Sequence, residues 1–148
     1  MSTRRLILLA LACGMAILVA GSIQLLRLSR SDNTVEIGRV GTAAAVDRVE
    51  VTLVERPEAD RVLVRVAVDP DRDALDDVAA PWAVRVGATR FPAVPTAFDD
   101  GPPDCAEVSR IDAGTSTECQ LRFVTSGEGT HYLQFTLSGT TAVWTLDG

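Results

Sequence analysis

Hydrophobic and polar side chains alternate along most of the chain after residue 44. In the segment 49–55, VEVTLVE, the apolar side chains of Val49, Val51 and Leu53 alternate with acidic and hydroxyl side chains. A period of two predicts a β-strand with one buried face. The same pattern predicts strands in the segments 61–68, 81–87, 89–94, 119–125 and 131–146, the last of which is expected to be a hairpin about Ser138-Gly139.

These segments amount to seven or eight strands at spacings of about 8–15 residues, without a convincing amphipathic helix. The pattern predicts an all-β fold, an immunoglobulin-like β-sandwich of seven to eight strands, over residues 44–148. Trp82 and Trp144 fall in phase with the apolar positions of their strands, so we expect both in the core.

A different pattern opens the chain, where Leu6 to Leu26 form a run without a charged residue. As a helix this run would cover roughly 31 Å, the hydrocarbon thickness of a bilayer. It predicts one N-terminal transmembrane helix at 6–26, preceded by a cytoplasmic tail at 1–5 and followed by a polar linker at 27–43. Cleavage as a signal peptide remains open, because Val19-Ala20-Gly21 and the next triplet have the small residues that such sites use.

Charge is distributed unevenly around this helix. Residues 1–30 carry four arginines and no acid, whereas the rest of the chain carries ten arginines and all twenty acids. An acidic body excludes nucleic acid as the expected partner, because a phosphate backbone needs a basic face. The chain has no lysine, which excludes chemistry that depends on a lysine amine.

Two cysteines, Cys105 and Cys119, flank a predicted turn near Asp112-Ala113-Gly114. A regular hairpin there would pair Cys119 with a residue two to four positions from Cys105. A small shift would bring the two sulfurs together, and we predict a disulfide. Two separate buried thiols are the alternative. Zinc is disfavoured because it needs four ligands, while His131 is the only histidine and Cys13 lies in the apolar run.

The other candidate residues do not form a known catalytic or metal motif. Five aspartates lie close together in one predicted loop. An EF-hand that began at Asp69 would need glycine at its sixth position and glutamate at its twelfth, but these positions are Ala74 and Ala80. We expect an acidic loop without a metal, and His131 as a half-buried structural residue. We expect no cofactor, no catalytic residue and no enzyme. The aspartates concerned are Asp69, Asp71, Asp73, Asp76 and Asp77, which Asp99, Asp100 and Asp104 would join if both loops lay at one end of the sandwich.

The order of the strands resembles a known group of proteins. The segments VDRVEVTLVE, RVLVRVAV, WAVRVGATRFP and IDAGTSTECQLRFVTSGEGTHYLQFTLSGTTAVWTL are similar to bacterial extracytoplasmic immunoglobulin-like domains of unknown function, related to immunoprotective extracellular antigens. The resemblance covers residues 41–146, and Ala113-Gly114 stands where the family usually has Pro-Gly. It implies a fold and a compartment outside the cytoplasm, and it implies no reaction.

The orientation of the helix rests on several signals. More arginines follow the apolar run than precede it, which by itself favours a cytoplasmic body. The predicted disulfide, the resemblance to exported domains and the Arg4-Arg5 start outweigh that count. We therefore expect a single-pass cell-membrane protein whose C-terminal domain is an extracytoplasmic, non-catalytic binding or accessory module for an unknown envelope protein or ligand. The alternatives are a small subunit of a membrane complex, or a secreted hydrolase or metal-dependent enzyme that uses the aspartate-rich loops.

Overall fold

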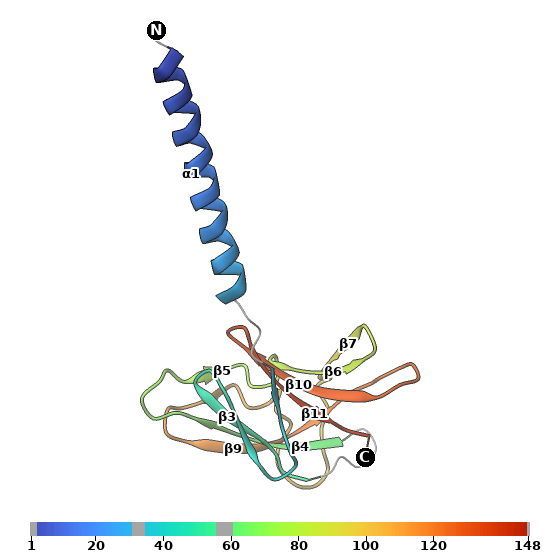
Figure 1. Cartoon of the computed structure of the whole chain (residues 1–148). Helices are drawn as coiled ribbons and strands as arrows, with labels where there is room; N and C mark the ends of the chain where they lie inside the picture. The colour runs from blue at the N-terminus through green and yellow to red at the C-terminus, as the bar shows by residue number, and fades with distance from the viewer. Residues whose placement is uncertain (1–2, 31–34, 56–60, 148) are drawn as a thin grey trace. The chain divides into compact units, whose positions relative to one another are not determined.

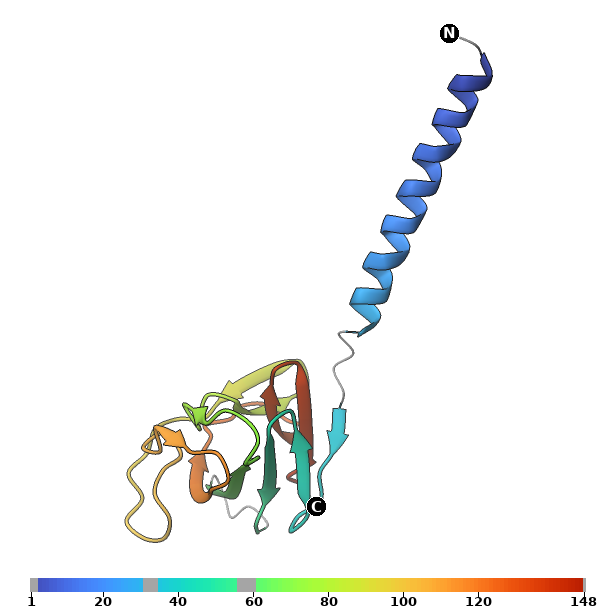
Figure 2. The same cartoon turned by 90° about the vertical axis from the view of Figure 1, so that its left-hand side faces the viewer.

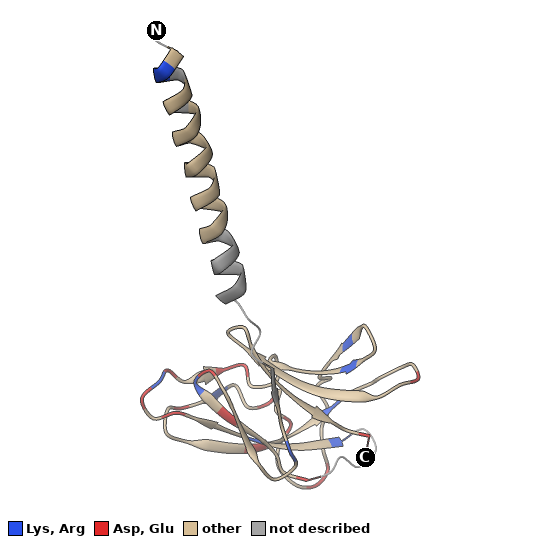
Figure 3. Cartoon of the chain, in the orientation of Figure 1, with Lys and Arg blue, Asp and Glu red and all other residues tan. Residues whose placement is uncertain are grey.

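The computed structural model describes residues 3–30, 35–55 and 61–147. It divides into two units, residues 1–33 and residues 34–148, each of which is described by itself. The first unit contains one helix, α1 (Thr3–Arg30), whose described part is uncharged except near its N-terminal end (Figure 3). The segment Thr3–Ile23 is long and apolar enough to cross a membrane, and its apolar residues are not buried against other parts of the protein.

Helix α1 is longer than the apolar run that predicted it. It begins at Thr3 and ends at Arg30, within the range expected to be linker. Arginine is a good helix former and is favoured near a helix C-terminus, where its positive charge meets the negative end of the helix dipole. Arg27 and Arg30 therefore suit the last turns of a helix that continues beyond the apolar segment.

The second unit is built from strands (Figures 1 and 2). The described residues contain eleven, against seven or eight expected. The additional ones have two to four residues each, too short for alternation to reveal them. The strands are β1 (Val35–Ile37), β2 (Ala43–Val46), β3 (Val49–Leu53), β4 (Arg61–Val68), β5 (Leu75–Asp76), β6 (Trp82–Val86), β7 (Thr89–Pro92), β8 (Arg110–Ile111), β9 (Ser116–Arg122), β10 (His131–Leu137) and β11 (Thr140–Thr145).

The strands form a β-sandwich, as the sequence predicted. One sheet has the order β1-β11-β10-β6-β7, the other has the order β2-β3-β4-β9, and β5 pairs with β8 separately. The chain crosses between the two large sheets from β1 to β2, from β4 to β6, from β7 to β9 and from β9 to β10. Repeated crossing between two sheets is typical of an immunoglobulin-like fold. Strand β1 lies within the segment that was predicted to be linker. A strand forms there because residues 35–37 pair in parallel with β11.

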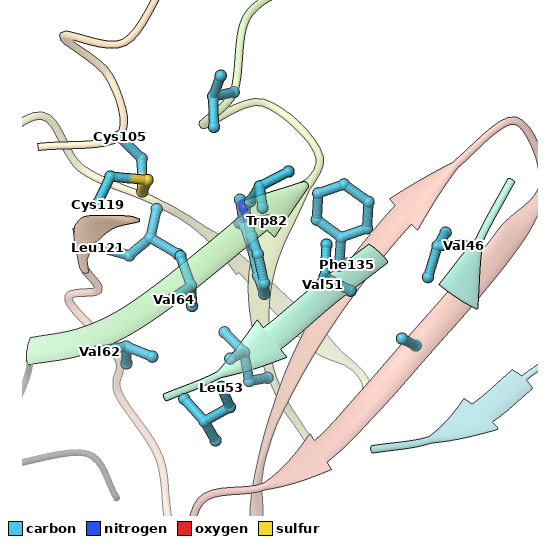
Figure 4. Close-up of a cluster of buried hydrophobic side chains, with 14 of the residues drawn as sticks. Val46, Val51, Leu53, Val62, Val64, Trp82, Cys105, Cys119, Leu121 and Phe135 are labelled. Atoms are coloured by element: carbon cyan, nitrogen blue, oxygen red, sulfur yellow. A yellow bond between two sulfur atoms is a disulfide. The ribbon is translucent and has the colours of Figure 1, made fainter. Parts of the chain in front are cut away.

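The apolar faces of the two sheets meet in a single core (Figure 4). Trp82 and Trp144 are each 1% exposed, which confirms their predicted burial. The centroid of the Trp82 ring lies 4.7 Å from that of the Phe135 ring, which it meets edge to face, and 5.9 Å from that of the Trp144 ring. Gly38 passes so close to Trp144 that a Cβ at this position would lie 2.0 Å from the indole Nε1. The backbone between β1 and β2 therefore reaches the core only because residue 38 has no side chain.

The last hairpin is the element that the sequence predicted in most detail. Ser138 and Gly139 form its turn with φ angles of 51° and 85°. Two consecutive positive φ angles suit the twist of the flanking strands in a two-residue turn. The turn sets Leu133 opposite Trp144 and Phe135 opposite Ala142, so that these four side chains share the buried face.

Candidate functional site

The predicted disulfide between Cys105 and Cys119 is present. The S–S bond is 2.04 Å long, the Cα atoms are 4.9 Å apart, and both residues are 0% exposed. The bond lies beside Leu121 in the core (Figure 4). It joins the long loop after β7 to strand β9, and it closes a ring between residues 14 positions apart.

The path between the two cysteines differs from the predicted hairpin. Strand β8 pairs with β5 instead of β9, and the loop before Cys105 runs parallel to β9 at an isolated bridge between Asp104 and Gln120. The amide of Cys105 donates to the carbonyl of Gln120 at 2.9 Å, and the amide of Gln120 donates to the carbonyl of Pro103 at 2.9 Å. Pro102 and Pro103 have no amide hydrogen to donate, so the pairing with β9 does not extend toward them as a regular ladder.

Buried polar groups hold this loop in place. Asp104 is 4% exposed, and its carboxylate accepts hydrogen bonds from the amides of Thr96 and Ala106. Gln120 is 2% exposed, and its amide nitrogen donates to the carbonyls of Asp100 and Pro102, both at 2.8 Å. These contacts satisfy the Asp104 carboxylate and the amide nitrogen of Gln120, whereas the Oε1 atom of Gln120 is buried without a hydrogen-bond partner among the described residues. The burial of Gln120 could not be predicted from the alternation, because Gln120 lies in phase with the outward positions of its strand.

The five aspartates of the loop after β4 do not converge. Asp69 accepts from the amide of Asp71 at 2.9 Å, Asp77 accepts from the amide of Ala80 at 3.3 Å, and Asp76 contacts Arg110 at 3.4 Å. These are the usual roles of aspartate in turns and surface ion pairs. Within the described residues, no group of three or more histidine, cysteine or acidic side chains is arranged to hold a metal ion.

The second aspartate group lies at the other end of the sandwich. Asp100 contacts Arg61, the first residue of β4, at 3.2 Å, whereas Asp69 follows the last residue of the same strand. At about 3.3 Å per residue, the eight residues of β4 separate the two loops by more than 20 Å. The two acidic loops therefore do not form one site.

His131 begins β10 and pairs with the carboxylate of Asp147, at 3.2 Å from its Nδ1 atom. The His131 side chain is 28% exposed, which agrees with its predicted half-buried position. The backbone amide of His131 also donates to Asp147, and this hydrogen bond lowers the pKa of the Asp147 carboxyl below its ordinary value of 3.8. The pair ties the end of the chain to the start of β10. Asp147 was not predicted from the sequence as the partner of His131.

An acidic groove lies on one sheet of the sandwich, lined by Asp47, Glu50 and Asp69. It has a volume of about 580 Å³ and crosses the outward face of β2, β3, β4 and β9. A hollow forms there because the side chains of Ala45, Ala67 and Ser116, which lie in the same cross-strand row as Glu50, are small. Glu50 is exposed, and the carboxylates of Asp47 and Asp69 line the same groove. The groove therefore offers negative charge above a floor of small side chains.

Comparisons with known proteins bear on the fold. No family model matches the chain, and no curated protein matches it. Among solved structures, it is similar to ycdA of Bacillus subtilis, described as a candidate lipoprotein, at 20% identity and a TM-score of 0.54 over 74% of this chain and 39% of that chain. The matched part thus spans well under half of ycdA.

Two further structures are less similar. A β-sandwich protein of Clostridium difficile 630 has 12% identity and a TM-score of 0.48 over 78% of this chain and 97% of that chain. A secreted protein of Mycobacterium tuberculosis has 14% identity and a TM-score of 0.47 over 74% and 95%. At 20% identity the likeness to ycdA shows a shared fold and nothing further.

Proposed function

We propose that the protein is a single-pass membrane protein whose β-sandwich lies outside the cytoplasm and binds another envelope component without catalysing a reaction. The observation that carries this proposal is a buried disulfide in a domain that follows an unburied apolar helix. The resemblance of the sequence to extracytoplasmic immunoglobulin-like domains supports the same compartment.

Two physical requirements support the proposed location. A disulfide persists in an oxidising compartment and is reduced in the cytosol of most organisms. Helix α1 has a 21-residue apolar segment whose surface is not buried by the rest of the protein. An apolar surface of this size needs a bilayer or a partner to cover it. An anchor in the cell membrane with the sandwich outside meets both requirements.

A binding role agrees with the arrangement of the polar groups. Catalytic side chains, whichever roles they take, must converge on one cavity where the substrate can react. Asp69 and Asp100 lie at opposite ends of β4, and His131 pairs with Asp147 at the end of the chain. The acidic groove is open to solvent and holds exposed Glu50, so it suits a basic side chain of a partner.

The thiol state and the membrane attachment test this proposal. Because Cys105 and Cys119 are 0% exposed, cells should be quenched in acid and denatured before alkylation. We expect alkylation of Cys13 alone without reductant, alkylation of all three cysteines after reduction, and a protein that stays in the membrane after an alkaline wash. Three alkylated cysteines without reductant, or release by the wash, would contradict the proposed location.

A matched pair of variants tests the groove. Glu50→Arg reverses a charge within the groove, and Glu107→Arg makes the same charge change at an exposed residue outside its lining. The probe is a fluorescent peptide of alternating arginine and serine, titrated onto the full chain in nanodiscs of phosphatidylcholine. We expect Glu50→Arg to weaken binding several-fold more than Glu107→Arg. Equal weakening would mean that only the net charge attracts the peptide.

A further inference from the structure

The outward face of β11, β10, β6 and β7 differs in charge from the rest of the sandwich. Strand register places Arg85 of β6 between Tyr132 of β10 and Arg90 of β7, in one row across the sheet. All three side chains are exposed, and Tyr132 is 38% exposed. Figure 3 shows basic residues on the hairpin formed by β6 and β7. We call this row and its outward neighbours on the four strands the arginine face.

The arginine face lacks acidic residues. The other outward positions of these four strands hold threonine, glutamine, valine, alanine and proline. By contrast, the outward face of the other sheet contains Glu50 and a salt bridge between Arg65 and Glu118. The chain has 20 acidic residues and 14 arginines, so acidic residues outnumber basic ones overall. The outward face of these four strands differs from this average, because it has arginines and no acidic residue.

The two arginines also lack an anionic partner among the described residues. The Nε of Arg85 donates to the carbonyl of Gly87 at 2.9 Å, and no carboxylate contacts Arg85 or Arg90. Like charges directly opposite each other on neighbouring strands destabilise a sheet. An anion placed over the pair would relieve this repulsion, and two guanidinium groups offer the paired donors that carboxylates accept.

We propose that the arginine face docks an acidic surface of a partner protein. Arginine and tyrosine are enriched in protein interfaces, where acidic residues and lysine are depleted, and the composition of this face follows that trend. Gln134 and Val143, half-buried at the centre of the face, supply the uncharged middle that such interfaces have. The chemistry of the contact is independent of the proposed location, but the assignment of the partner to the cell envelope rests on it.

The number of charges favours a protein over a lipid surface. Binding to anionic lipid uses clusters of about 4–8 basic residues, whereas this face has Arg85 and Arg90. Four strands about 4.8 Å apart and about five residues long cover on the order of 300 Å². A stable interface buries about 800 Å² on each partner, so this contact alone is weak and sensitive to salt.

The test uses the full chain in nanodiscs of phosphatidylcholine and a fluorescent peptide of alternating glutamate and serine. The variant is Arg85→Glu with Arg90→Glu. The matched control is Arg39→Glu with Arg72→Glu, which makes the same charge change at exposed residues outside the arginine face. We expect the dissociation constant to rise at least about tenfold in the variant and less than about threefold in the control.

Two outcomes would overturn the proposal. An equal loss in the variant and the control would show that net charge governs peptide binding. Vesicles with phosphatidylglycerol that bind the chain and displace the peptide, with the same dependence on Arg85 and Arg90, would make lipid the occupant. Since the nanodisc assay does not depend on where the protein resides in cells, neither outcome bears on the proposed location.

Discussion

The disulfide gives the most quantitative prediction for stability. Replacing Cys105 and Cys119 together with alanine removes a cross-link between residues 14 positions apart. In the chain-entropy model a closed loop of this length contributes about 3 kcal/mol to the free energy of unfolding. For a domain of the size of residues 34–148, this corresponds to a fall in Tm of about 12 °C.

The change in Tm is measured by thermal unfolding of the full chain in detergent. The unfolding is followed by circular dichroism near 215 nm, where strands absorb. Cys13→Ala is the control, because Cys13 lies in α1 and forms no disulfide. Each single variant should lose about as much as the double variant, because either substitution breaks the bond and a free thiol is tolerated in a core. Reductant should leave the folded wild type unchanged, since both sulfurs are buried. A fall in Tm of less than about 3 °C would refute the reasoning.

Two further predictions concern the core and the end of the chain. Gly38→Ala places a methyl group against the indole of Trp144, and we expect a loss of about 1–3 kcal/mol in denaturant unfolding; an unchanged midpoint would contradict that contact. Asp147→Asn removes a carboxylate whose pKa is lowered by the amide of His131. Its stabilising effect is present above pH 3.8 and is lost as the pH falls through the lowered pKa, so the difference in Tm between wild type and variant should shrink below about pH 4. A difference independent of pH would contradict this role.

The sequence predicted the strands that carry a clear alternation. Segments such as 61–68 and 131–146 show a period of two over many residues, and both were assigned correctly. Strands β1, β5 and β8 have two or three residues each, and tertiary pairing defines them more than local sequence does. The disulfide was predicted correctly, but the predicted hairpin between its cysteines was wrong. The short strand β8 pairs with β5 instead of β9, and local sequence does not indicate this tertiary pairing.

The candidate sites were harder to predict because closeness in sequence does not give convergence in space. The aspartates of the loop after β4 satisfy separate local hydrogen bonds and ion pairs. The arginine face, by contrast, has a signal in the sequence. A two-residue connection at Gly87-Ala88 fixes the register of the hairpin, and this register sets Arg85 opposite Arg90.

The location of the sandwich is the central claim, and labelling of introduced cysteines in intact cells tests it most directly. In a Cys13→Ala background, Thr130→Cys places a thiol at an exposed site before β10, and Ser2→Cys places one before α1. A membrane-impermeant maleimide should label Thr130→Cys in intact cells and Ser2→Cys only after lysis. The opposite pattern, with Ser2→Cys labelled in intact cells and Thr130→Cys only after lysis, would place the sandwich in the cytoplasm and contradict the account.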